Sequence, residues 1–179
     1  RFFILDVQNA SNPNKLSHKN MNAEIQAIDV DADSAYVATQ DGLQILDISN
    51  SSDPQIITNG TLSFGEQARD IELVDSYAYI AVGNAFKIVD VSDQSNPFEE
   101  SDLFLDETIE AVHKSSDSDI FYAIGNNHIF KIDVTDPSNP SKLNSWPTNN
   151  GRDILTYKDN ICALDAKSLN IMDPAITQG

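Results

Sequence analysis

Five charged side chains are of the types that bind or transform a small polar molecule: Arg69, Asp70, Glu110, Arg152 and Asp153. Arginine guanidinium groups donate hydrogen bonds to an anion, a sugar or a partner's side chain. Two carboxylates such as Glu110 and Asp153 could instead supply acid–base catalysis on a sugar. The same residues therefore support a binding hypothesis and a catalytic hypothesis, and the fold must position them for either one.

A repeated pattern indicates how the chain positions these side chains. Apolar runs end in aspartate at intervals of 41 (47−6), 43 (90−47), 43 (133−90) and 40 (173−133) residues, and a proline follows each of the first four aspartates by seven positions. Repeats of about 40–45 residues with several strands each are typical of a β-propeller. The aspartates are Asp6, Asp47, Asp90, Asp133 and Asp173, and the prolines are Pro13, Pro54, Pro97 and Pro140.

One repeat, from Gln67 to Leu105, reads as four strands. Short turns separate a short strand at 69–73, a strand at 77–82 that is rich in aromatic and β-branched residues, and a third strand at 85–91. A more polar strand at 98–105 suits the exposed edge of a sheet. Helical periodicity is not found in any segment. The sequence therefore predicts an all-β fold, a propeller of four-stranded antiparallel blades.

Alignment of about four repeats predicts a single propeller region over residues 1–179. Complete blades are expected at about 21–63, 64–106 and 107–147, with partial blades at 1–20 and 148–179. Joining the ends would give a four-blade ring with one third strand too many, whereas six to eight blades need roughly 250–340 residues. We therefore expect an arc of a larger propeller, cut from a longer polypeptide.

The pattern resembles the LVIVD repeat family, which is named for the apolar run that ends in aspartate. The resemblance rests on Leu43-Gln-Ile-Leu-Asp47, on Phe130-Lys-Ile-Asp133 with its following proline-rich turn, and on second strands such as Ala78-Tyr-Ile-Ala81. It covers nearly the whole chain, but Met172-Asp-Pro174 departs from it. The resemblance implies a β-propeller on bacterial, archaeal or protist surface and secreted proteins, usually without a defined biochemical role.

The alignment brings the charged residues to the innermost strands. Their positions are equivalent in successive repeats, where the side chains are Gln26, Arg69, Glu110 and Arg152, followed by Ala27, Asp70, Ala111 and Asp153. We expect either an ionic belt that fills a wet axial channel or a polar ligand site in which arginines donate hydrogen bonds. The recurring aspartates and prolines are expected to be structural anchors instead, because a residue needed in every blade serves a need that every blade shares.

Metal, cofactor and nucleophile signals are weak. Asp29-Val-Asp31-Ala-Asp33-Ser34 has the alternating oxygen ligands that attract calcium, but it fails as an EF-hand loop and coincides with an expected turn. The histidines His18, His113 and His128 lack the spacing of zinc ligands. Cys162, the single cysteine, replaces a recurrent tyrosine in a strand and is expected to be a buried, inert thiol. We therefore expect no metal and no cofactor, with calcium as the alternative.

Composition restricts the partners. The net charge of −17 argues against binding to nucleic acid or to anionic lipid, and no apolar stretch is long enough to cross a bilayer. Sequons at Asn9, Asn50 and Asn59 permit glycosylation. No catalytic motif is found, so we expect a non-enzymatic interaction module of a secreted or cell-surface protein that binds protein or glycan. The alternatives are a subunit of an extracellular filament and a propeller enzyme acting on a sugar.

Overall fold

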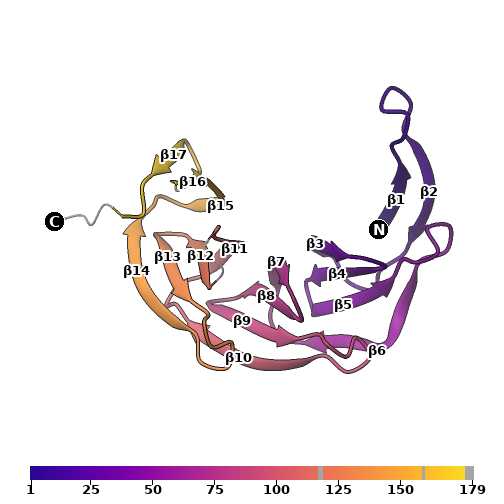
Figure 1. Cartoon of the computed structure of the whole chain (residues 1–179), viewed down its shortest axis with the longest axis horizontal. Helices are drawn as coiled ribbons and strands as arrows, with labels where there is room; N and C mark the ends of the chain where they lie inside the picture. The colour runs from indigo at the N-terminus through magenta and orange to yellow at the C-terminus, as the bar shows by residue number, and fades with distance from the viewer. Residues whose placement is uncertain (117–118, 159, 176–179) are drawn as a thin grey trace.

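The chain is an open arc of antiparallel β-sheets. The computed structural model describes residues 1–116, 119–158 and 160–175, and this part of the chain contains strands and turns but no helix. The described strands form five sheets that are arranged radially along the arc, with the two termini at opposite ends (Figure 1). The all-β, four-stranded antiparallel architecture and the open arc confirm the fold class expected from the repeat.

Three sheets are complete blades, and the sheets at the two ends have fewer strands. An N-terminal hairpin comprises β1 (Phe2–Asp6) and β2 (Asn14–Lys19). Blade I comprises β3 (Ile25–Asp31), β4 (Ser34–Thr39), β5 (Gly42–Asp47) and β6 (Gln55–Ser63). Blade II comprises β7 (Ala68–Val74), β8 (Tyr77–Val82), β9 (Ala85–Asp90) and β10 (Phe98–Phe104). Blade III comprises β11 (Ile109–Lys114), β12 (Ile120–Gly125), β13 (His128–Asp133) and β14 (Ser141–Pro147). The C-terminal sheet comprises β15 (Gly151–Tyr157), β16 (Asn160–Asp165) and β17 (Leu169–Met172).

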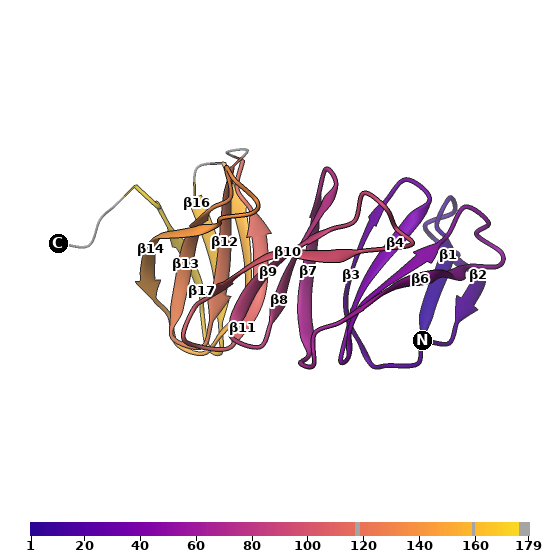
Figure 2. The same ribbon diagram turned by 90° about the horizontal axis from the view of Figure 1, so that it is seen from below.

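Strands follow one another in space in their order along the chain. The first strands β3, β7, β11 and β15 lie on the inside of the arc, and the fourth strands β6, β10 and β14 form its outer rim (Figure 1). Strands run across the thickness of the arc, so that the turns collect on its two flat sides (Figure 2). This arrangement puts the first strands next to each other around the inner rim.

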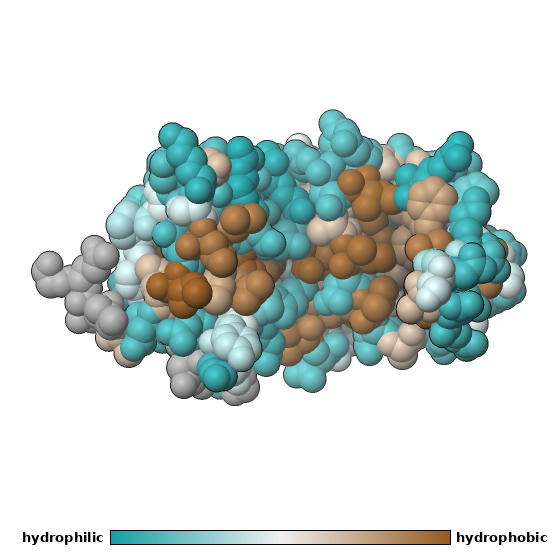
Figure 3. Space-filling model, turned by 90° about the horizontal axis from the view of Figure 1, so that it is seen from above, coloured by the Kyte–Doolittle hydropathy of each residue, from teal (hydrophilic) through white to brown (hydrophobic). Residues whose placement is uncertain are grey.

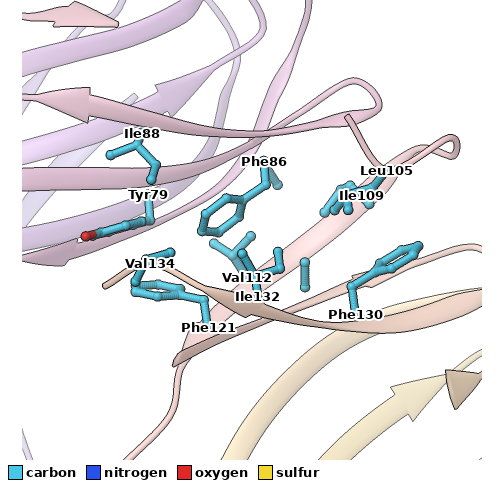
Figure 4. Packing of buried hydrophobic residues seen from close by; sticks show 12 residues of the cluster. Tyr79, Phe86, Ile88, Leu105, Ile109, Val112, Phe121, Phe130, Ile132 and Val134 are labelled. Atoms are coloured by element: carbon cyan, nitrogen blue, oxygen red, sulfur yellow. The ribbon is translucent and has the colours of Figure 1, made fainter. Parts of the chain in front are cut away.

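Each blade buries both of its faces, because a sheet lies on either side. We call the face toward the following sheet the forward face and the other the backward face. On blade I, Tyr36 and Leu43 of the forward face pack with blade II, whereas Ala35 and Leu46 of the backward face pack with the hairpin. Because both faces are covered, β4 is buried along its whole length. Strands that are buried in this way have nearly continuous apolar sequences. Figure 4 shows the corresponding cluster between blades II and III.

Candidate ligand-binding surface on the inner strands

A β-bulge occurs at the same place in every first strand of the blades and of the C-terminal sheet. The pairing register shifts across one residue near the start of each strand, between Ile25 and Ala27 in β3 and correspondingly in β7, β11 and β15. The residue left out of the pairing is Gln26, Arg69, Glu110 or Arg152. A bulge twists the strand and redirects a side chain, so these four repeat-equivalent side chains share one backbone setting.

Arg69 and Glu110 are close to each other on neighbouring blades. Arg69 Nη1 lies 3.7 Å from Glu110 Oε2, and the two side chains are 32% and 22% exposed. Arg69 Nε is buried without a hydrogen-bond partner among the described residues. Arg152 is exposed, and no ion pair joins it to Glu110 within the described part of the chain. The structure therefore brings two of the expected site residues together and leaves Arg152 open to solvent.

Asp70 connects blade II to blade III. Its Oδ1 accepts a hydrogen bond from the N–H of Ile71 at 2.9 Å, and its Oδ2 accepts one from the N–H of Val112 at 2.9 Å. Burial raises the pKa of the Asp70 carboxyl, although the hydrogen bonds from Val112 and Ile71 oppose the shift. The negative charge of Asp153 adds to the increase in this pKa. Because its oxygens already have backbone partners, Asp70 serves the junction between blades.

Asp153 has the position of Asp70 but a different setting. Its Oδ1 accepts the N–H of Ile154 at 2.8 Å, and the residue is exposed. The next sheet that would provide a partner for Oδ2 is not present in the described chain, because β15–β17 is the end of the arc. In the described chain Asp153 is thus exposed, whereas Asp70 is partly buried.

Two further carboxylates, Asp29 and Glu72, connect blades, a role that the sequence analysis did not assign to them. Asp29 Oδ2 accepts the N–H of Leu73 at 2.8 Å, and Glu72 Oε2 accepts the N–H of Lys114 at 2.7 Å. Glu72 Oε2 also lies 3.3 Å from His113 Nδ1, and this hydrogen bond raises the pKa of His113. Asp29 and Glu72 both lie two positions after the first residue that is paired beyond the bulge. This shared position is the sequence signal that could have revealed them.

The recurring aspartates bind the turns that follow them. In all five runs the carboxylate accepts the backbone N–H of the residue two positions later, at 2.8 to 2.9 Å. The hydroxyls of Ser49 and Thr135 lower the pKa of Asp47 and Asp133, and the backbone N–H bonds add to the decrease. Of the repeated prolines, Pro54, Pro97 and Pro140 are buried and Pro13 is exposed. Each of these carboxylates thus binds the turn that follows its own strand.

The acidic run after Asp29 does not form a cation cage in the described chain. Asp29 lies within β3 and binds backbone N–H groups, and only Ala32 and Asp33 form the turn, with Ala32 at φ 48°. The expectation of an Asp-rich turn over this segment is therefore wrong for Asp29. No cluster of three or more His, Cys, Asp or Glu side chains that could hold a metal occurs among the described residues.

The remaining predicted positions lie away from the inner strands. Asn9, Asn50 and Asn59 are all exposed, so the backbone geometry leaves the three sequons accessible. Asn9 and Asn50 use their side-chain oxygens to accept N–H groups two residues later, as ordinary turn residues do. Cys162 is partly buried on the forward face of the C-terminal sheet.

A hollow of about 230 Å³ on blade III contains a glutamate that the sequence analysis missed. Glu107 Oε2 accepts hydrogen bonds from the backbone N–H of Asn127 at 2.7 Å and from its Nδ2 at 2.8 Å. Glu107 Oε1 lies 3.1 Å from His128 Nδ1, and the glutamate side chain is only 11% exposed. This carboxylate fixes the turn before β13, which leaves it little freedom to contact a ligand.

Radially arranged antiparallel sheets, each with its first strand on the inner rim, define the chain as part of a β-propeller. The chain contains two adjacent LVIVD repeats, at residues 24–60 and 65–102. They correspond to blade I and to most of blade II. No curated protein matches the chain in sequence.

Solved structures support the same fold. The chain is similar to the computationally designed Ika4 protein, with 10% identity and a TM-score of 0.69 over 88% of this chain and 95% of that one. It is similar to the designed Ika8 protein, with 11% identity and a TM-score of 0.68 over 89% of this chain and 49% of that one. The periplasmic gluconolactonase of Pseudomonas aeruginosa gives 9% identity and a TM-score of 0.80 over 94% and 58%. The chain thus spans about half the length of two of these proteins.

Proposed function

We propose that this chain is a non-catalytic β-propeller module that binds a protein or glycan partner within a larger secreted or cell-surface protein. The observation that carries the proposal is the shared bulge, which presents four equivalent side chains of three different types at the inner rim. Features required by the fold recur in every repeat, whereas residues that recognise a partner differ between repeats. Those side chains are Gln26, Arg69, Glu110 and Arg152.

Charge supports the choice of partner. The net charge of −17 disfavours phosphate-rich nucleic acid, and the inner rim offers guanidinium donors within this acidic surface. Arginine forks suit the carboxylates and hydroxyls of proteins and glycans. No helix in the described residues is long and apolar enough to cross a membrane. Location outside the cell or at its surface follows from the family resemblance and remains part of this proposal.

Binding to printed glycans and to immobilised extracellular proteins tests the proposal. The chain with Arg69→Ala, Glu110→Ala and Arg152→Ala should lose at least about tenfold in affinity, since each good charged contact contributes roughly 1.5–3 kcal/mol. A matched control replaces three exposed residues of other strands and turns, Lys15, Asp53 and Lys142, by alanine and should bind within about twofold of the wild type.

Two results would contradict the proposal. Unchanged binding by the folded triple variant at Arg69, Glu110 and Arg152 would show that the binding site lies elsewhere. Loss of a hydrolase or lyase activity of the full protein in that variant, with its circular dichroism spectrum intact, would favour the enzyme, in which Glu110 and Asp153 act on a sugar.

A further inference from the structure

The guanidinium of Arg69 has unused hydrogen-bonding capacity at the inner rim. Its Nη1 lies 3.7 Å from Glu110 Oε2, which is longer than the roughly 2.7–3.2 Å of a hydrogen bond. Its Nε is buried and has no hydrogen-bond partner among the described residues. A guanidinium can donate five hydrogen bonds, and a donor that loses water without gaining an acceptor costs free energy. Arg69 thus has donor groups that the described part of the chain does not match with acceptors.

The neighbouring carboxylates do not supply the acceptor. Both oxygens of Asp70 already accept backbone N–H groups. Glu110 lies at the bulge of the next blade and approaches only Nη1 of Arg69. The four bulge residues comprise two arginines, one glutamate and one glutamine, so together they carry a net charge of +1. One carboxylate from a ligand would balance the charge of this set.

Packing holds the Arg69 side chain in place before any ligand binds. Water does not reach Nε, so the 32% of the side chain that is exposed lies at its other atoms. The bulge in β7 fixes the backbone from which the side chain extends. A group that is already ordered loses less conformational freedom when a ligand binds it. Arg69 is therefore suited to be the anchor of a binding site.

The surface around Arg69 combines several kinds of contact. Gln26, Arg69 and Glu110 lie at equivalent bulges of three successive inner strands, so an amide, a guanidinium and a carboxylate follow one another along the rim. Glutamine and glutamate oxygens accept hydrogen bonds from hydroxyls, and an arginine binds a carboxylate through two parallel hydrogen bonds. Figure 3, which views the concave side of the arc, shows teal polar surface between brown apolar areas. This combination fits a ligand that has a carboxylate, hydroxyls and C–H groups close together.

We propose that the inner rim binds a sugar acid of a glycan, either a uronic or a sialic acid, and that Arg69 binds its carboxylate. Gln26 and Glu110 accept hydrogen bonds from hydroxyls of the same sugar. This inference rests on the proposed function and specifies its ligand. An acidic side chain of a protein has no hydroxyl beside its carboxylate, so it would bring a second negative charge to Glu110 without a donor for it.

Acidic glycans printed beside their carboxyl-reduced forms test the class of ligand. Reduction converts the carboxylate to a hydroxymethyl group and leaves the other hydroxyls in place. The chain should bind the acidic form of at least one glycan at least about tenfold more tightly than the reduced form, since a hydrogen bond to a charged group contributes enough for such a ratio.

Three variants locate the carboxylate. Arg69→Gln should abolish the preference, so that the two forms bind within about twofold of each other, and Gln26 shows that the equivalent bulge accommodates glutamine. Lys15→Gln makes the same change in net charge at an exposed position and should retain the preference within about twofold. Glu110→Gln keeps an oxygen for a hydroxyl and removes the competing charge, so it should tighten binding of the acidic form at least about twofold.

Four outcomes would overturn this inference. The first is equal binding of acidic and carboxyl-reduced glycans, and the second is an unchanged preference in the folded Arg69→Gln chain. The third is binding by Glu110→Gln that is at least about tenfold weaker, because the site would then need the charge of the chain more than that of the ligand. The fourth is binding of a protein, but of no acidic glycan, that the triple variant loses. In that case the proposed function would stand and only the choice of ligand would fail.

Discussion

The junction between blades I and II and the junction between blades II and III solve one packing problem in two ways. Tyr36 and Tyr79 occupy equivalent positions on the forward faces. Tyr79 stacks on Phe121 of blade III with ring centroids 4.1 Å apart, and burial raises its pKa to about 12. Tyr36 faces a blade that has Ala78 at the position of Phe121, and its hydroxyl accepts a hydrogen bond from Gln94 Nε2 at 2.9 Å.

The contrast extends to the residues around each tyrosine. Gln94 also accepts a hydrogen bond from Ser34 Oγ at 3.0 Å, and it comes from the turn of blade II that leans on blade I. Gly60 permits this approach, because a Cβ there would lie 2.8 Å from the carbonyl oxygen of Gln94. At the position of Gln94, blade III has Pro137, whose carbonyl accepts the hydroxyl of Ser101. The polar turn residue Gln94 thus contacts the tyrosine at the first junction, and the large apolar residue Phe121 contacts the tyrosine at the second.

The largest expected effect comes from removing the aromatic contact. Phe121→Ala should lower the free energy of unfolding by about 3–5 kcal/mol, because it leaves a cavity beside Tyr79 and Phe86. Urea unfolding measures the loss. Phe98→Ala, which truncates a half-exposed ring on β10, is the control and should cost less than about 1 kcal/mol. Equal losses in both variants would show that the stack does not dominate this junction.

A smaller effect is expected from Asp70 of the second junction, a carboxylate whose equivalent position in blade I is Ala27. Asp70→Ala should cost about 1–3 kcal/mol, because it leaves the buried N–H of Val112 without its partner. Blade I has Ala27 at this position, and its carboxylate bond to blade II comes instead from Asp29, whose Oδ2 accepts the N–H of Leu73. Asp153→Ala removes the equivalent but exposed carboxylate and should cost less than about 0.5 kcal/mol. Equilibrium unfolding of the two variants in urea makes the comparison, and a larger loss for Asp153→Ala would contradict the prediction.

The junction between blades I and II should respond to a change that leaves the junction between blades II and III intact. Gln94→Ala removes the hydrogen bonds to Tyr36 and Ser34, and we expect a loss of about 0.5–1.5 kcal/mol in urea unfolding. Ser101→Ala removes the hydroxyl that binds Pro137 and serves as the matched change at the second junction. If Gln94→Ala proved neutral, packing on Ala78 alone would account for the first junction.

The smallest expected effect is a dependence on pH that only the second junction shows. The hydrogen bond to Glu72 raises the pKa of His113 above 6.5, burial opposes the shift, and the charges of Glu72, Asp153 and Asp70 add to it. A raised pKa in the folded state means that this stabilisation is complete below pH 6.5 and is lost as the pH rises through the raised value. His113→Gln should remove that part of the pH dependence in urea unfolding, whereas Gln94→Ala should preserve it.

The sequence predicted the features that depend on chain neighbours. Asp90 binds Ser92 two residues away, so its anchoring hydrogen bond follows from local geometry. The equivalence of Arg69 and Glu110 followed from the repeat. The partners of Asp29 and Gln94 lie 44 and 58 residues away in the chain, and no local pattern specifies which blade they reach. Asp70 binds the next blade whereas Asp153 is exposed, and this difference depends on where each sheet lies in the arc. Equivalent sequence positions do not encode that location.

The carboxylate bonds between blades all point the same way along the chain. Asp29, Asp70 and Glu72 are acceptors, and the N–H groups that they bind belong to the following blade. During synthesis on the ribosome, each acceptor therefore emerges about one repeat before its donor. Each blade therefore folds against a preceding blade whose carboxylates are already in place. The blades can thus assemble in the order in which they are translated.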